Sequence, residues 1–186
     1  VSGQTYRTET QEILGDNDYE KFGHSVAIDG TTAIIGANGT PDSCYIFEYN
    51  GSTWTKVQKI PSPDSNTDFG YSVAISGNYA IVGAYKASNE DGAAFIFQHN
   101  GSNWSQVTRI QGSDTASDDG HFGNSVAISG NTAIVGAYEA NNKYGGAYII
   151  ERNGDGTWGN EVSGQTYRKE TYKLRESDRN SSGRLG

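Results

Sequence analysis

The sequence predicts an all-β protein, and three observations lead to that prediction. The chain of 186 residues repeats itself about every 50 residues, and each repeat holds four short runs with the composition of β-strands. No stretch keeps a sustained 3.6-residue apolar period, so we expect almost no helix. Aromatic side chains make up 11% of the chain, which argues against disorder, and the 25 glycines suit tight turns.

The repeat opens with a motif that occurs three times, at residues 22–37, 69–84 and 122–137. It reads Phe-Gly-x-Ser-Val-Ala-Ile-x-Gly-x-x-Ala-Ile-x-Gly-Ala in each copy, where x is variable. A tryptophan follows each motif, after a turn that begins with Asn-Gly. A period of about 50 residues with four strands per unit is typical of a β-propeller blade.

The second repeat shows how the four strands are recognised. Its first strand alternates around Val73 and Ile75, and Gly77-Asn78 is a two-residue turn of the kind that tolerates a positive φ. A polar loop of residues 85–91 leads to the third strand, and Asn100-Gly101 turns the chain into the fourth. The predicted strands cover residues 72–76, 79–84, 93–98 and 104–110.

The same period divides the chain into five parts. Residues 1–21 are expected to form an outer strand and an acidic loop that precede the first blade. The three blades are expected at residues 22–68, 69–121 and 122–176. Residues 177–186 are expected to be a tail or the opening of a further repeat.

One segment of ten residues is present twice. Residues 1–10 recur at residues 162–171 with a single difference, Thr8 against Lys169. Both copies stand where the fourth strand of a blade belongs. The sequence therefore predicts three blades of four antiparallel strands plus an extra outer strand, and it leaves open which copy completes a blade.

Three blades do not close a ring, because known propellers use about four to eight. An open arc would expose two apolar blade faces to water, which monomers avoid. Two copies that associate through their blade faces about a two-fold axis would close a six-bladed ring. We favour this pairing over the second interpretation, a fragment of a longer propeller, and an open or domain-swapped form is the third.

The motif, followed by Gly-Ala-Ala-Phe-Ile-Phe and a tryptophan in the second repeat, resembles the FG-GAP repeat. This repeat builds the propeller of integrin α-subunits and of many bacterial surface and secreted proteins. The likeness spans about residues 22–160. It implies a non-enzymatic binding or adhesion module at the cell surface or outside the cell.

One part of the integrin pattern is missing. Integrin-type blades often carry a calcium loop of the Asp-x-Asp-x-Asp-Gly kind between the first two strands. Here that place holds a two-residue turn such as Gly77-Asn78, which cannot supply the six to eight oxygens that calcium needs. We therefore expect no cofactor and no calcium at the usual position of the family.

The long loops after the second and fourth strands of each blade share one rim, and they are rich in acidic residues and tyrosine. Repeat proteins commonly bind ligands through such loops, here a protein or a carbohydrate. The competing interpretation is that the loops only keep the blades soluble. Asp64, Asn66 and Asp68 are weak metal candidates, because they lack the turn glycine and distal glutamate of an EF-hand. The candidate ligand residues are Asp64, Asp68, Tyr85, Glu90, Asp91, Asp114, Asp118, Asp119, Tyr138 and Tyr144.

Several classes of function are disfavoured by the sequence. A net charge of −8 argues against binding to nucleic acid or to an anionic membrane surface. No apolar run approaches the roughly 18 residues of a membrane span, so no membrane insertion is expected. His24, His99 and His121 lie at different positions of the repeat and within no nucleophile motif, so we expect no catalytic residue and no enzyme.

Overall fold

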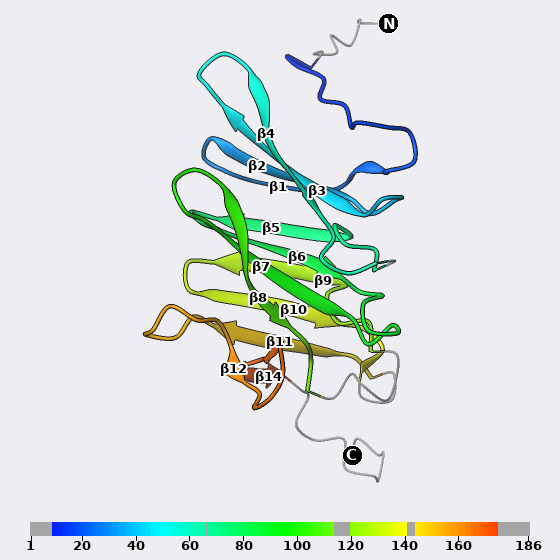
Figure 1. Cartoon of the computed structure of the whole chain (residues 1–186), viewed down its shortest axis with the longest axis vertical. Helices are drawn as coiled ribbons and strands as arrows, with labels where there is room; N and C mark the ends of the chain where they lie inside the picture. Colours follow the sequence, from blue (N-terminus) through cyan, green and yellow to red (C-terminus); the bar gives the residue numbers. More distant parts are fainter. Residues whose placement is uncertain (1–8, 66, 114–119, 141–143, 175–186) are drawn as a thin grey trace, which may run out of the picture.

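The structure is a computed structural model that describes residues 9–65, 67–113, 120–140 and 144–174. These residues form fourteen strands, and most of the strands belong to three antiparallel four-stranded blades (Figure 1). Blade 1 consists of β1 (Phe22–Asp29), β2 (Thr32–Ala37), β3 (Ser43–Tyr49) and β4 (Trp54–Pro61). Blade 2 consists of β5 (Ser72–Ser76), β6 (Tyr79–Ala84), β7 (Ala93–His99) and β8 (Trp104–Ile110). Blade 3 consists of β9 (Ser125–Ser129), β10 (Thr132–Ala137), β11 (Gly146–Glu151) and β14 (Tyr172–Leu174).

The predicted all-β class is confirmed, and the predicted strands of the second repeat agree with β5 to β8 except that β7 is one residue longer. The turn glycines explain this agreement. Gly30, Gly77 and Gly130 adopt φ values of 57°, 54° and 56°, so the three blades use the same tight turn between their first two strands.

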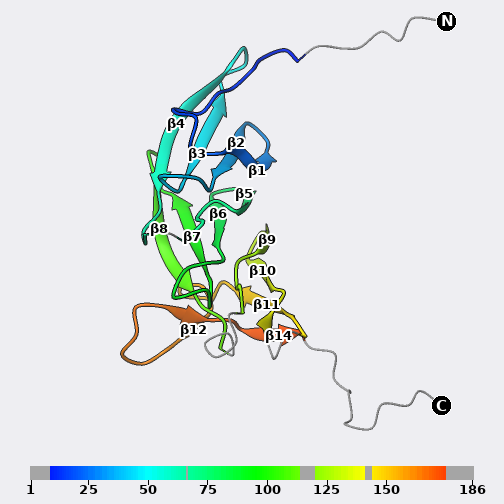
Figure 2. The same cartoon turned by 90° about the vertical axis from the view of Figure 1, so that its right-hand side faces the viewer.

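The blades stack face to face along the long axis of the molecule. Figure 2 shows the innermost strands β1, β5 and β9 along one side and the outer strands β4 and β8 along the other. Each internal interface is apolar. Ile34 and Ile46 of blade 1 pack against blade 2, and Ile81 and Ile96 of blade 2 pack against blade 3 in the same way. A stack of this kind hides the two faces of blade 2 and one face of each end blade.

The glycines of the repeated motif allow the blades to approach closely. A Cβ added to Gly36 would lie 2.0 Å from the carbonyl oxygen of Gly70, and one added to Gly83 would lie 1.9 Å from that of Gly123. Gly70 and Gly123 follow the motif phenylalanines and have φ values of 90° and 94°. The Phe-Gly of one blade therefore fits against the Gly-Ala at the end of the second strand of the preceding blade.

The sequence left open which copy of the duplicated segment completes a blade, and the structure displaces the second copy from the fourth-strand position of blade 3. Residues 160–169 leave blade 3 and form a ribbon of β12 (Asn160–Glu161) and β13 (Arg168–Lys169), which pairs with β8 of blade 2. Gly159, with a φ of 68°, turns the chain away just after Trp158. The carbonyl of Gly159 then accepts hydrogen bonds from the guanidinium of Arg168, which close the ribbon. Strand β14 completes blade 3 instead.

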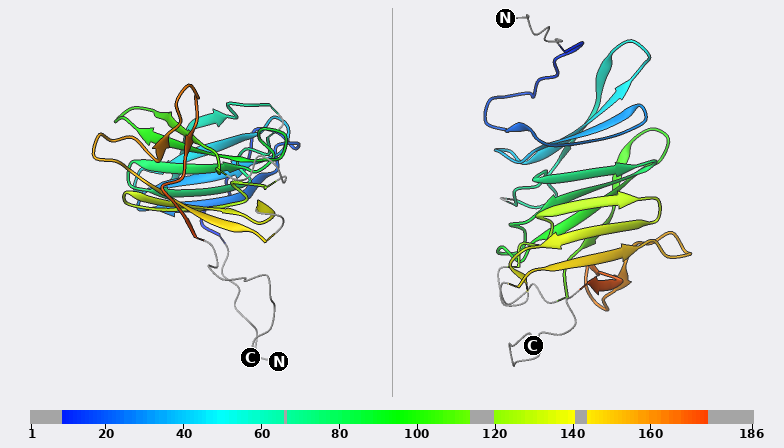
Figure 3. Two further views of the ribbon diagram at one scale, coloured as in Figure 1. Left: turned by 90° about the horizontal axis from the view of Figure 1, so that it is seen from below. Right: turned by 180° about the vertical axis from the view of Figure 1, so that it is seen from behind.

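Residues 9–21, which begin with the last two residues of the first copy, lie at the opposite end of the stack from the ribbon (Figure 3). Residues 1–8 of this copy are outside the described residues, and residues 9–21 run beside blade 1 without joining a ladder. The described residues 9–21 contain no strand, so the outer strand expected in residues 1–21 stays a prediction.

Candidate functional site

Five aromatic rings form a continuous row across the rim. His24 neighbours Tyr71 with ring centroids 4.7 Å apart, and Tyr71 neighbours Tyr85 at 4.5 Å. Tyr85 in turn neighbours His121 at 5.5 Å, and His121 stacks on Tyr138 at 4.9 Å with an interplanar angle of 13°. We call these five residues the aromatic row. It joins all three blades. His24 lies at the start of β1, Tyr71 and His121 precede β5 and β9, and Tyr85 and Tyr138 directly follow β6 and β10.

His121 is the fourth ring of the row and lies between the tyrosines that follow the second strands of blades 2 and 3. Its side chain is buried, and its ring lies between Tyr85 and Tyr138. Its Nε2 atom is 3.8 Å from a carboxylate oxygen of Glu90, and its Nδ1 atom is 3.8 Å from one of Glu139. The row therefore has a carboxylate near each of the two ring nitrogens of His121.

Tyr85 connects the row to an ion pair. The Lys86 ammonium lies 3.0 Å from the Asp68 carboxylate and 5.3 Å from the centre of the Tyr85 ring. Burial raises the pKa of Tyr85, and a hydrogen bond between its hydroxyl and Asp68 raises this pKa further. Tyr85 is therefore held protonated as a hydrogen-bond donor, next to a carboxylate that already has a cationic partner.

A polar pocket of about 520 Å³ opens beside the row, between blades 1 and 2. Its lining includes Tyr19, Lys21, Asn38, Asp68 and Lys86. Asn38 follows the motif of the first repeat, where the other two repeats have the tyrosines of the row. The smaller side chain leaves space that a tyrosine ring would fill.

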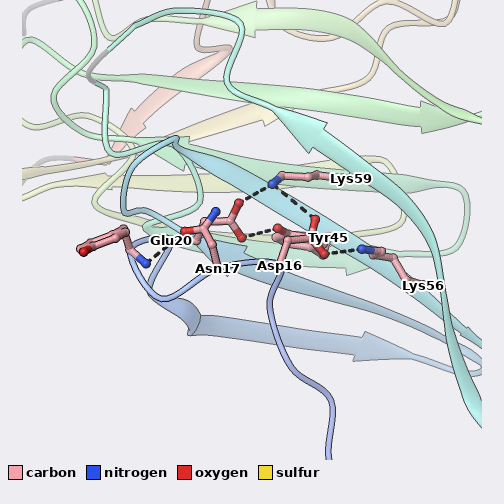
Figure 4. A network of polar contacts seen from close by, with 7 residues as sticks. Asp16, Asn17, Glu20, Tyr45, Lys56 and Lys59 are labelled. Atoms are coloured by element: carbon pink, nitrogen blue, oxygen red, sulfur yellow. Dashed lines mark hydrogen bonds and ion pairs between the residues drawn. The ribbon is translucent and has the colours of Figure 1, made fainter.

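A second polar cluster joins the segment before β1 to strands β3 and β4 of blade 1 (Figure 4). The fully buried Glu20 accepts hydrogen bonds from the Tyr45 hydroxyl and the Lys59 ammonium, and Asp16 pairs with Lys56. Burial opposes ionisation of Glu20, but the bonds from Lys59 and Tyr45 outweigh it and hold the pKa of Glu20 below its ordinary value. The cluster is a satisfied internal network.

The same arrangement recurs in blade 2, where it uses one of the predicted site residues. The Arg109 guanidinium lies over the Phe95 ring at 5.7 Å and pairs with Asp64 at 3.2 Å, as Lys59 lies over Tyr45 and pairs with Glu20. Asp64 therefore belongs to a structural ion pair on the outer side of blade 2, apart from the aromatic row.

The structure brings some of the predicted ligand residues together and separates others. Asp68, Tyr85, Glu90 and Tyr138 gather at the aromatic row. The backbone carbonyl of Asp91 accepts a hydrogen bond from the amide of Phe122 across the blade 2 and 3 interface. Tyr144, with 72% of its side chain exposed, lies in the loop after β10. Asp114, Asp118 and Asp119 lie outside the described residues.

The structure does not bring the weak metal candidates Asp64 and Asp68 together. Asp64 and Asp68 have separate cationic partners, Arg109 and Lys86, and Asn66 lies outside the described residues. Among the residues that the structure describes, no group of three or more His, Cys, Asp or Glu side chains is placed to hold a metal ion. Within the same residues, no helix is long and apolar enough to span a membrane.

Three members of the row, His24, Tyr71 and His121, were not among the predicted site residues. His24 and Tyr71 occupy the variable position after Phe-Gly, and His121 immediately precedes the Phe-Gly of its repeat. The available signal was the presence of an aromatic ring at these positions. The sequence alone did not show that stacking of the blades places the rings in one line.

The comparison with protein families gives three matches to the FG-GAP repeat, at residues 15–47, 54–97 and 104–150. Each of the last two matches runs from the outer strand of one blade to the third strand of the next. A search of the curated proteins found no match to the chain. The three family matches together cover more than half of the sequence, and the chain belongs to the FG-GAP repeat family.

Proposed function

We propose that the chain is a non-enzymatic extracellular binding module that holds a protein or carbohydrate ligand on the aromatic row. FG-GAP repeats are in general binding or adhesion modules of propeller type, and they typically occur in extracellular or surface proteins. The observation that carries the proposal is the unbroken row of five rings with Glu90 and Glu139 beside His121.

The chemistry of the row favours a basic protein surface. Arginine and lysine side chains are attracted to the faces of tyrosine rings, and carboxylates beside the rings add charge-assisted hydrogen bonds. The net charge of −8 increases the rate at which a basic partner reaches the surface. The neighbouring pocket of about 520 Å³ is within the usual size of a small-ligand site and could accept one side chain or one sugar ring.

Tyr138 is the residue with which to test this proposal, because 52% of its side chain is exposed and its removal leaves the blade core intact. We would measure binding of the full chain to arrays of basic peptides and of glycans, and then compare Tyr138→Ala with Tyr49→Ala. Tyr49 is also exposed, but it ends the third strand of blade 1 at the opposite rim.

We expect Tyr138→Ala to bind the peptide or glycan about tenfold or more weakly than the unaltered chain does. The double variant with Glu90→Gln and Glu139→Gln should lose a similar amount of affinity. Tyr49→Ala should bind as the unaltered chain does. Hits confined to basic peptides support the protein ligand, and hits confined to glycans support the carbohydrate. Equal binding by Tyr138→Ala and the unaltered chain would contradict the assignment of the row.

A second candidate function is self-assembly through the blade faces, and one observation favours it. Val26 and Ile28 of β1 are 70% and 63% exposed, whereas the equivalent Val73 and Ile75 of β5 are 7% and 8% exposed. The face of blade 1 that carries Val26 and Ile28 thus has the side chains of an internal interface without a neighbouring blade. The light-scattering measurement described in the next section tests this candidate.

A further inference from the structure

The segment of residues 9–13 contacts blade 1 in the way that an outer strand contacts the next blade. The side-chain amide of Gln11 donates to the carbonyl of Trp54 and accepts from the amide of Trp54, both at 2.8 Å. Gln58 of β4 makes the same two bonds to Trp104 of blade 2, also at 2.8 Å. Gln11 thus repeats the contact by which one outer strand holds the next.

The apolar side chain two residues further on repeats as well. Ile13 packs on the cluster that contains Tyr45 and Phe47 of blade 1, and Ile60 of β4 packs in the cluster that contains Phe95 and Phe97 of blade 2. Residues 11–13 therefore stand at the fourth-strand position of a blade in front of blade 1. The described part of the chain places no third strand beside them.

Blade 3 offers the matching third strand. Its fourth strand, β14, pairs with β11 through only three residues, with Tyr172 opposite Ile149 and Leu174 opposite Ala147. Ile46 of blade 1 holds the position of Ile149, and Gln58 lies opposite it, so Tyr172 and Gln58 occupy the same place in the fourth strand. Because the first copy of the duplicated segment leads into Gln11 as the second copy leads into Tyr172, residues 11–13 and 172–174 are equivalent.

The outward faces of blade 3 and blade 1 correspond to the two sides of an internal blade interface. The outward face of blade 3 carries Ile134 and Ile149 half-buried and Leu174 52% exposed. At the internal interfaces the equivalent residues of blade 1 are fully or nearly fully buried, and they pack against the strand that corresponds to β1. The exposed Val26 and Ile28 of β1 are the side chains that such a face covers.

We propose that two copies of the chain exchange outer strands. Residues 9–14 of one copy pair with β11 of the second copy in place of β14, while the β1 face of the first copy packs on the blade 3 face of the second. This inference rests on the self-assembly candidate above and identifies the segment that would link the copies. Applied twice about a two-fold axis, the exchange closes six blades.

Disulfide trapping tests the register of the exchange. Ile13 would lie opposite Ala147 of the second copy with both side chains on one face, as Ile60 lies opposite Cys44 in blade 1. We would mix the full-length variants Ile13→Cys and Ala147→Cys, both with Cys44→Ala, under mild oxidation. The matched control replaces Ile13→Cys by Glu12→Cys, whose side chain would point to the opposite face.

The expected product is a mixed disulfide between residues 13 and 147, identified by mass spectrometry, with little product from the residue 12 control. Equal trapping by both pairs, or no trapping by either, would overturn the exchange. Light scattering of the unaltered chain and of Val26→Asp separates the two levels of the proposal. If the unaltered chain is a dimer that Val26→Asp dissociates, but no mixed disulfide forms, then self-assembly is supported and the strand exchange is rejected. A monomer at every concentration rejects both and leaves the binding test on the aromatic row unaffected.

Discussion

Blade 2 has a neighbouring blade on each face, whereas blades 1 and 3 each have a neighbour on only one. The three blades carry the same Ser-Val-Ala-Ile sequence in their first strand. Ile75 of blade 2 is nevertheless 8% exposed, and Ile28 of blade 1 is 63% exposed. The comparison teaches that the local sequence determines the strand and its turns, and that the place of a blade in the stack determines how much its side chains contribute to stability.

The largest expected difference follows from these two isoleucines. Ile75→Ala leaves a cavity in the interface of blades 1 and 2, and it should lower the free energy of unfolding by about 3 kcal/mol. Ile28→Ala should change it by about 0.5 kcal/mol or less, because the side chain is mostly in water. Urea denaturation of dilute protein, followed by tryptophan fluorescence, measures both. A large loss at Ile28 that disappears on dilution would indicate that a second copy covers this face.

The motif glycines give a second matched pair. Gly83→Ala would place its Cβ 1.9 Å from the backbone oxygen of Gly123 in blade 3, so the two blades must separate. Gly136 stands at the same position in blade 3, and its nearest neighbour for a Cβ is the hydroxyl of Ser125, a side chain that can rotate. Gly83→Ala should cost about 2 kcal/mol or more, and Gly136→Ala clearly less. Equal losses in thermal melts would refute the role of Gly83 in blade contact.

Much of the fold could be predicted because it is encoded locally and three times over. The turn Gly77-Asn78 and the alternation around Val73 and Ile75 locate β5 and β6 without reference to the rest of the chain. The ribbon of residues 160–169 could not be predicted in the same way. It depends on the turn at Gly159 and on the pairing of Arg168 with Ile110 of β8, which lies 58 residues earlier in the sequence.

The candidate site was harder to predict than the fold for a related reason. Tyr85 and Tyr138 were identified by their loops, but the row is completed by His24, Tyr71 and His121. These rings meet the two tyrosines or one another only when the blades stack. Asp64 was identified by its charge and its loop, yet its partner is Arg109 on the outer strand of blade 2. Charge and loop position alone do not distinguish a free carboxylate from one in a structural ion pair.

The glutamines that hold the outer strands give a smaller contrast. Gln58→Ala removes two hydrogen bonds to the backbone of Trp104 in a partly buried place, and it should cost about 1.5 kcal/mol. Gln11→Ala removes the same two bonds to Trp54 in an exposed place and should cost about 0.5 kcal/mol in the monomer. Chemical denaturation at several protein concentrations is the measurement. A Gln11 effect that grows with concentration would favour exchange of the N-terminal strand between copies.

The smallest expected effect concerns the buried carboxylate of Glu20 in the polar cluster of blade 1. The hydrogen bonds from Lys59 and Tyr45 hold the pKa of Glu20 below its ordinary value, so this carboxylate binds its proton less readily in the folded state than in the unfolded state. Its contribution is therefore fully present above the ordinary pKa of 4.5 and is lost as the pH falls through the lower pKa of the folded state. In Glu20→Gln the free energy of unfolding should fall less steeply between about pH 5 and pH 3, by up to about 1 kcal/mol. Glu12→Gln, which removes an exposed carboxylate from the same segment, should keep the slope of the unaltered chain. If both variants keep that slope, the buried cluster of blade 1 does not contribute to the acid sensitivity of the fold.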